Sequence, residues 1–193
     1  MEIPARAEFI DLIFLILCLR IIYISVSRGI VQESFKLIGL LVASFFAFHY
    51  YSLLGDAIQN KISFLNREYL YFTSFLLILL GVRTVFNLLR LIVTLLFKIG
   101  HASPTERWLG LFLGGVRAVF LSSIIIFLLV LSPLNPKYFS NSLSYAFFKN
   151  IAPKIYLLSY NLYSKFNSSS VSNEEVERYY KTLGTTSEQN KKG

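Results

Sequence analysis

Long apolar runs interrupted by arginine constrain this chain more than any other feature. Four long apolar runs follow one another, Phe9–Val26, Leu37–Leu54, Tyr69–Phe97 and Trp108–Leu131, and arginine interrupts the first, third and fourth. A helix needs roughly 20 apolar residues to cross the hydrocarbon core of a bilayer. The third and fourth runs reach that length alone, and the first two reach it with flanking residues. Because a helix satisfies its backbone groups within one segment, we predict four transmembrane helices.

Composition supports an all-α, polytopic membrane protein. The chain has 193 residues, of which 54% are hydrophobic and 16% are charged, whereas soluble domains contain about 25% charged residues. The net charge of +8 suits a protein beside anionic lipid headgroups. We therefore expect membrane lipids as partners, and no nucleic acid, because no basic cluster lies on a soluble domain.

The first apolar run is predicted to be a retained helix rather than a cleaved signal peptide. A signal peptide needs a basic start, an uninterrupted apolar region and a cleavage site of small residues. Here Glu2 and Glu8 outnumber Arg6 before the run, Arg20 interrupts it, and no small-residue site follows. The same run holds the single cysteine, Cys18, which cannot form an internal disulfide.

Short links between the runs make consecutive helices antiparallel neighbours. Lysine and arginine concentrate near the cytoplasmic ends of membrane helices. The first and third links and their flanks contain Arg28, Lys36, Arg90, Lys98 and Arg107. We predict that these two links face the cytoplasm and that both termini lie outside it.

The fourth helix has a clear start signal. Ser103-Pro104-Thr105-Glu106 matches a capping box, with Ser103 as the N-cap and proline at the first helical position. Gly100, just before it, is predicted to end the third helix.

Small residues recur every four positions in the second and fourth runs, so they share one helix face. They are Gly39, Ala43 and Ala47 in the second run, and Gly110, Gly114, Ala118 and Ser122 in the fourth. Such stripes let membrane helices approach closely. The preferred interpretation is that the second and fourth helices pack together through Gly39/Ala43 and Gly110/Gly114. The alternative is a face for homo-oligomers or other membrane proteins.

A layer of polar side chains is predicted inside the membrane near the first and third links. We take the helix ends at these links as the membrane boundary on that side. With a rise of about 1.5 Å per residue, Arg20, Arg83 and Arg117 lie about 10–15 Å inside the membrane from this boundary, and Glu33 lies about 5–8 Å inside it. Asn87 shares a helix face with Arg83. Two interpretations remain open: a polar passage or site for an anionic group, or structural pairing with arginines that extend to the headgroups.

The chain divides into three predicted regions. Residues 1–136 form the four-helix transmembrane domain, which ends at Pro133 and Pro136. Residues 137–166 form an amphipathic segment that lies in the headgroup plane or folds over the ends of the bundle. Residues 167–193 form a flexible polar tail with one short helix at Glu174–Leu183, capped by Asn173.

Motifs typical of enzymes are missing from the sequence. It contains no phosphate-binding glycine loop with lysine, no paired zinc histidines and no Gly-x-Ser-x-Gly. His49 lies in an aromatic stretch typical of a membrane interface, and His101 lies near the opposite end. We predict no catalytic residues, no cofactor and no metal.

Several motifs together resemble the CvpA (colicin V production) family of bacterial inner-membrane proteins. Asp11 lies near the start of the first helix, as in that family, and Arg28-Gly29-Ile30-Val31-Gln32-Glu33 is similar to its Arg-Gly-Phe-x-x-Glu signature. Thr105-Glu106-Arg107-x-x-Gly110-x-x-x-Gly114-x-x-Arg117 is similar to its acid-Arg, Gly, Gly, Arg pattern. The similarity covers residues 9–132, and more loosely extends to about residue 160.

Three positions depart from the family pattern: Glu106 replaces an aspartate, Gln32 a frequent arginine and Ala118 a glycine. The resemblance implies a multi-pass protein of the bacterial inner membrane. It also implies a role in the production or export of the peptide toxin colicin V and in envelope integrity. Two functions are consistent with it: a non-enzymatic scaffold or accessory factor, or a small oligomeric channel or transporter that uses the arginine layer.

Overall fold

Seven helices make up the part of the chain that the computed structural model describes, which is residues 3–27, 29–61, 66–97, 104–133, 139, 142–166 and 172–189. They are α1 (Ile3–Val26), α2 (Gly29–Gln59), α3 (Arg67–Phe97), α4 (Pro104–Leu131), α5 (Leu143–Phe148), α6 (Ile151–Phe166) and α7 (Glu174–Gln189). No strand occurs among these residues. The N-cap Ser103 and the helix-ending Gly100 lie outside the described residues, although α4 does begin at the predicted Pro104.

Four of these helices are long and apolar enough to cross a membrane. The spans are Phe9–Val26, Ile30–Gln59, Arg67–Leu95 and Thr105–Leu131, which confirms the prediction of an all-α polytopic protein. The second span begins seven residues before the predicted Leu37. The apolar run itself begins after the charged residues Glu33 and Lys36, whereas the helix continues through both of them.

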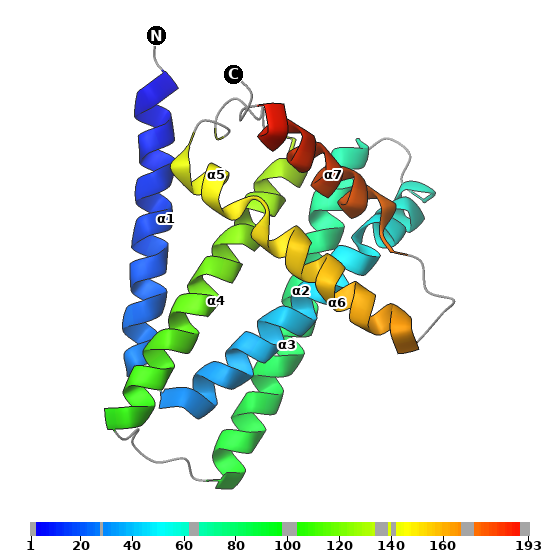
Figure 1. Ribbon diagram of the computed structural model, residues 1–193. Helices are drawn as coiled ribbons and strands as arrows, with labels where there is room; N and C mark the ends of the chain where they lie inside the picture. The colour runs from blue at the N-terminus through cyan, green and yellow to red at the C-terminus, as the bar shows by residue number, and fades with distance from the viewer. Residues whose placement is uncertain are drawn as a thin grey trace.

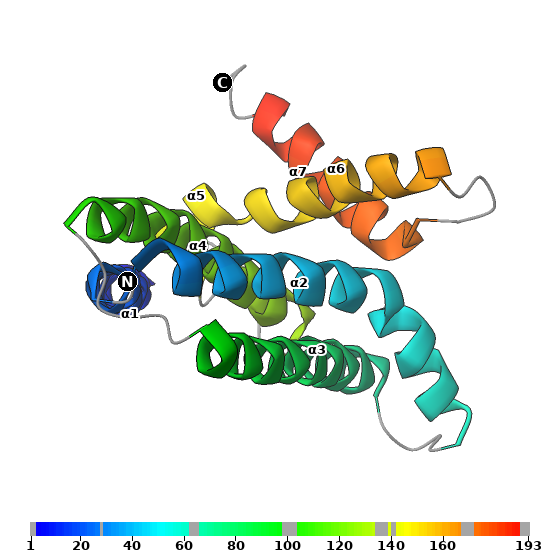
Figure 2. The same ribbon diagram turned by 90° about the horizontal axis from the view of Figure 1, so that it is seen from below.

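The four long helices are ordered α1–α4–α2–α3 by their contacts (Figure 1). The most extensive packing is between α2 and α3, between α1 and α4, and between α2 and α4. The view from below shows α2 between α4 and α3, with α1 beside α4 (Figure 2). In this arrangement α1 and α3 keep most of their surface on the outside of the bundle.

Aromatic side chains fill the centre of the bundle. Phe48 of α2 lies with its ring centroid 4.6 Å from that of Phe127 of α4 and 5.1 Å from that of Phe75 of α3. All three rings are at most 2% exposed. Rings packed this closely stabilise the bundle through van der Waals contact, which drives the association of helices in a membrane because lipid is as apolar as the rings themselves. Pairs at these distances also gain from the attraction between ring edges and faces.

The helix α6 folds over the bundle rather than lying away from it. It packs against α2, α4 and α7, and Ala152 and Tyr156 belong to the same buried cluster as the aromatic centre. Its outward side still presents Leu158 and Leu162, which are 57% and 59% exposed. The inward face therefore fits the interpretation of a helix folded over the bundle, and the exposed leucines leave room for headgroup contact.

The described residues of the C-terminal region form a helix that is longer than the sequence predicted. The predicted helix at Glu174–Leu183 is present and continues to Gln189. Val176 is fully buried and Asn173 is 7% exposed. The start of α7 is therefore docked on the bundle.

Candidate functional site

A buried ion pair joins α2 to α4 near the end of the bundle where α1 ends. Glu33 Oε2 lies 2.6 Å from Arg117 Nη1. The residues are 1% and 7% exposed, respectively. Ser25 of α1, also buried, donates a hydrogen bond from Oγ to Glu33 Oε2 at 3.0 Å and accepts one from Arg117 Nη2 at 3.4 Å. Three helices thus meet at one carboxylate.

Lys36 completes this group by contacting the other carboxylate oxygen, Glu33 Oε1. Its side chain is only 8% exposed. Lys36 lies three residues after Glu33, on the same face of α2. We call Ser25, Glu33, Lys36 and Arg117 the charged cluster. A buried carboxylate with three donors is fully satisfied, as low-dielectric surroundings require.

Gly114 allows α1 to reach the charged cluster. A Cβ at this position would collide with Cβ and Oγ of Ser25. Glycine on α4 therefore lets the serine of α1 lie against the Glu33–Arg117 pair. This arrangement gives one structural reason for glycine and arginine three positions apart in the sequence motif.

The predicted packing of the second helix against the fourth is present, but Gly39 and Gly114 of the two stripes lie against other helices. The helices α2 and α4 do pack together, with Ala43, Ala47 and Ala118 buried. However, a Cβ on Gly39 would lie 2.8 Å from Phe86 Cβ of α3, and Gly114 faces α1. Including Gly39 and Gly114 in the contact between α2 and α4 was therefore wrong, because four-residue spacing identifies a helix face but not the helix that lies against it.

The predicted polar layer is smaller than expected. Arg20 on α1 and Asn87 on α3 are exposed, and Arg83 on α3 is half-buried. Including Arg20 and Asn87 in a buried layer was wrong. The estimated depth of a residue along a helix does not determine which face of the helix carries it.

Asp11, at the other end of α1, anchors the chain after α4. Its carboxylate accepts hydrogen bonds from the backbone N–H of Leu143 at 3.1 Å and of Ser144 at 2.7 Å. These groups open α5, where helical N–H groups have no partner within the helix. An apolar cavity of about 610 Å³ lies beside this contact, lined partly by Phe14 and Phe147.

The remaining motif residues lie around the start of α2 and α4. Gly29 is the first residue of α2, and Arg28 lies outside the described residues. Glu106 is half-buried in the first turn of α4, Arg107 is exposed, and Gly110 is buried.

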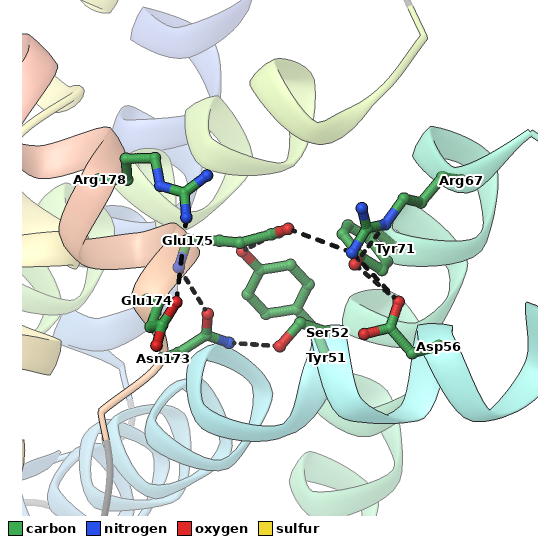
Figure 3. Close-up of polar contacts among 9 residues, drawn as sticks. All are labelled: Tyr51, Ser52, Asp56, Arg67, Tyr71, Asn173, Glu174, Glu175 and Arg178. Atoms are coloured by element: carbon green, nitrogen blue, oxygen red, sulfur yellow. Dashed lines mark hydrogen bonds and ion pairs between the residues drawn. The ribbon is translucent and has the colours of Figure 1, made fainter.

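A second polar group holds α7 against α2 and α3 at the opposite end of the bundle (Figure 3). Arg67 Nη2 lies 3.4 Å from Asp56 Oδ1, and the same atom lies 3.8 Å from Glu175 Oε1. Tyr71 donates to Asp56 at 2.8 Å and accepts from Arg67 Nε at 2.6 Å. Tyr51 donates to Glu175 at 3.3 Å.

Asn173 provides the second half of this attachment. Its Oδ1 caps α7 by accepting from the N–H of Glu175 at 3.1 Å, as predicted. Its Nδ2 donates to the carbonyl oxygen of Phe48 and to Ser52 Oγ, both at 2.9 Å. Its backbone N–H donates to Tyr156 Oη at 3.1 Å, and burial raises the pKa of Tyr156 to about 12.

We call Asp56, Arg67, Tyr71, Asn173 and Glu175 the α7 clamp. A cavity of about 490 Å³ lies along it. Both acids there have basic or hydroxyl partners, so the clamp acts chemically as an attachment. In the described part of the chain, no three His, Cys, Asp or Glu side chains converge in a way that would hold a metal ion.

Sequence reasoning missed most of these partners. Lys36 carried a usable signal, because lysine three residues after a buried glutamate shares its face. Ser25 carried none, because only the packing of α1 brings it to Glu33. The contact of Arg67 with Glu175 carried none either, because it depends on the docking of α7.

Comparison with known proteins identifies one family. The family model described as "Colicin V production protein" matches residues 10–153. The matched region contains Asp11, the charged cluster and the first three residues of α6, and it ends before α7. Comparisons with curated proteins and with solved structures gave no match.

Proposed function

Because this chain belongs to the colicin V production protein family, we propose that it is a non-enzymatic membrane scaffold. It serves as an accessory factor in toxin production or export and in envelope integrity. The chain is a multi-pass membrane protein, and we place it in the bacterial inner membrane.

The charged cluster is the observation that supports a scaffold over a channel. A channel that used these charged side chains would need water to reach them. Here Glu33 and Arg117 are almost fully buried and contact each other directly. Their partners come from three helices, so the cluster fixes the relative positions of α1, α2 and α4. A rigid bundle of this kind suits a protein that positions others.

The two ends of the bundle are suited to different surroundings. The end where α1 finishes and α4 starts carries the basic residues that we assign to the cytoplasmic side, where anionic headgroups are the expected partners. The other end carries the start of α1 and the docked α7 (Figure 1). The α7 clamp then faces away from the cytoplasm, where it offers a surface for envelope components.

Ion flux through reconstituted vesicles tests this proposal. Purified protein in vesicles loaded with potassium chloride should add no leak over protein-free vesicles, whether a potassium, chloride or proton gradient is imposed. A leak that disappears in Arg117→Gln vesicles would contradict the scaffold and support the channel. Ser27→Ala, at an exposed position near the same end of α1, is the matched control variant.

A further inference from the structure

One face of α3 presents an unbroken seam to the outside of the bundle. The seam residues recur at alternating steps of four and three, and every one of them is exposed: Thr73, Leu77, Leu80, Thr84, Asn87 and Leu91. Alternating steps of four and three place residues along one line of a helix that packs against a parallel helix at a shallow angle. The seam faces away from α2, which is the main partner of α3 in this chain.

Asn87 makes this face unlike an ordinary lipid-facing surface. It lies eight residues before Leu95, the end of the span, and therefore about 12 Å along the helix from that end. Its amide has two donor hydrogens and an acceptor oxygen, and hydrocarbon offers none of them a partner.

Arg20, the exposed arginine of α1, can place its polar group outside the hydrocarbon, whereas Asn87 cannot. The long side chain of Arg20 can extend to the headgroups, whereas an asparagine side chain is too short to do so. Most other exposed side chains of α1 at similar depth are apolar, including Leu15, Ile16 and Leu19. The surface of α1 is therefore suited to lipid, and the seam of α3 is suited to a polar partner.

We propose that the α3 seam binds a second copy of this chain, with Asn87 hydrogen-bonded to Asn87 of that copy. Two copies share one topology in one membrane, so a two-fold axis along the membrane normal makes their α3 helices parallel and brings equal residues together. An amide is both donor and acceptor, which makes this pairing self-complementary. Gly81, beside the seam, has no atom within 4 Å of where a Cβ would lie, which leaves room for close approach.

This inference rests on the membrane-spanning fold and adds a partner to the proposed scaffold. Flux measurements test the scaffold and are independent of the dimer. Failure of the dimer would leave the flux result unchanged, so the two failures are distinguishable.

Cysteine cross-linking in native membranes tests the seam. In a Cys18→Ser background, single cysteines replace Leu80, Thr84 or Leu91 on the seam, and Val85 or Leu89 off it. Both control positions are exposed, at 54% and 47%. Mild oxidation should give disulfide-linked dimers at the three seam positions and little at the two controls. Equal cross-linking everywhere, no dimer at any position, or adducts with other proteins alone would overturn the proposal.

The role of Asn87 is tested by its own variants. Asn87→Leu places an apolar side chain on an exposed membrane face, so folding of the single chain is not threatened. We expect its dimer association constant in lipid to fall by about threefold to fifteenfold, the range for side-chain hydrogen bonds between membrane helices. Asn87→Gln should keep most of the association. Energy transfer between labelled copies measures both, and unchanged association in Asn87→Leu would refute the pairing.

Discussion

Glu33→Gln is the substitution with the clearest expected cost. Glutamine keeps the shape of the side chain and removes its charge. Arg117 and Lys36 would then lose the carboxylate that they contact, while their side chains stay 8% exposed. A buried cation that loses its counter-ion cannot regain it from lipid or water without opening the bundle.

Breaking a buried ion pair by removing one partner costs about 3–5 kcal/mol. For a chain of this length, 1 kcal/mol corresponds to about 2–4 °C in Tm. The Glu33→Gln protein should therefore unfold about 6–20 °C below the parent. Arg117→Gln in the same protein should recover part of that loss, because it removes the cation that the first change deprived of the Glu33 carboxylate.

Thermal unfolding of both single variants and the double variant in detergent measures this coupling. The exposed pair Glu174–Arg178, at 3.9 Å, supplies the control, since surface pairs contribute little. Its substitution by glutamines should leave Tm unchanged. If the effects of Glu33→Gln and Arg117→Gln simply add, the two side chains do not act as a pair and the reasoning fails.

Two further predictions rest on single contacts, and a third rests on the distribution of basic residues between the links. Gly114→Ala should lower the free energy of unfolding by about 1–3 kcal/mol, because the new Cβ overpacks against Ser25. Gly115→Ala should change it little, because the space around its Cβ is open. Thermal unfolding of the two variants compares them, and equal losses of stability would contradict the contact. Asn173→Ala should release α7 and speed its proteolysis, and unchanged cleavage would show that the cap and its bonds to α2 do not hold it. A reporter fused after Gly193 that works only in the cytoplasm should stay silent, and strong activity would reverse the orientation.

The four membrane helices were predictable because length and apolarity alone decide whether a segment can span a bilayer. The cap at Asn173 was predictable because capping depends on residues within three positions of one another. The pairing of Glu33 with one of three arginines was reachable, since Glu33 was the one acid plainly placed in that half of the membrane. The choice of Arg117 was not, because it depends on how each helix is rotated.

Rotation and tertiary neighbours explain the remaining differences. Asn87 was grouped with Arg83 by spacing, yet it faces out because α3 contacts the bundle mainly through α2. Gly39 was assigned to α4 and lies against Phe86, because two glycine stripes carry no information on which helix each one meets. The attachment of α7 joins Asn173 to Phe48 across 125 positions, and no local pattern signals a contact at that separation.

Thiol labelling at two serines near the end of α1 tests the closed bundle most directly. Ser25 is fully buried within the charged cluster, and Ser27, two residues on, is exposed. In a Cys18→Ser background, a hydrophilic thiol reagent added to open membranes should label Ser27→Cys rapidly and leave Ser25→Cys largely unmodified. Rapid labelling of both cysteines would show that water reaches Glu33 and Arg117, and would contradict the account of a sealed scaffold.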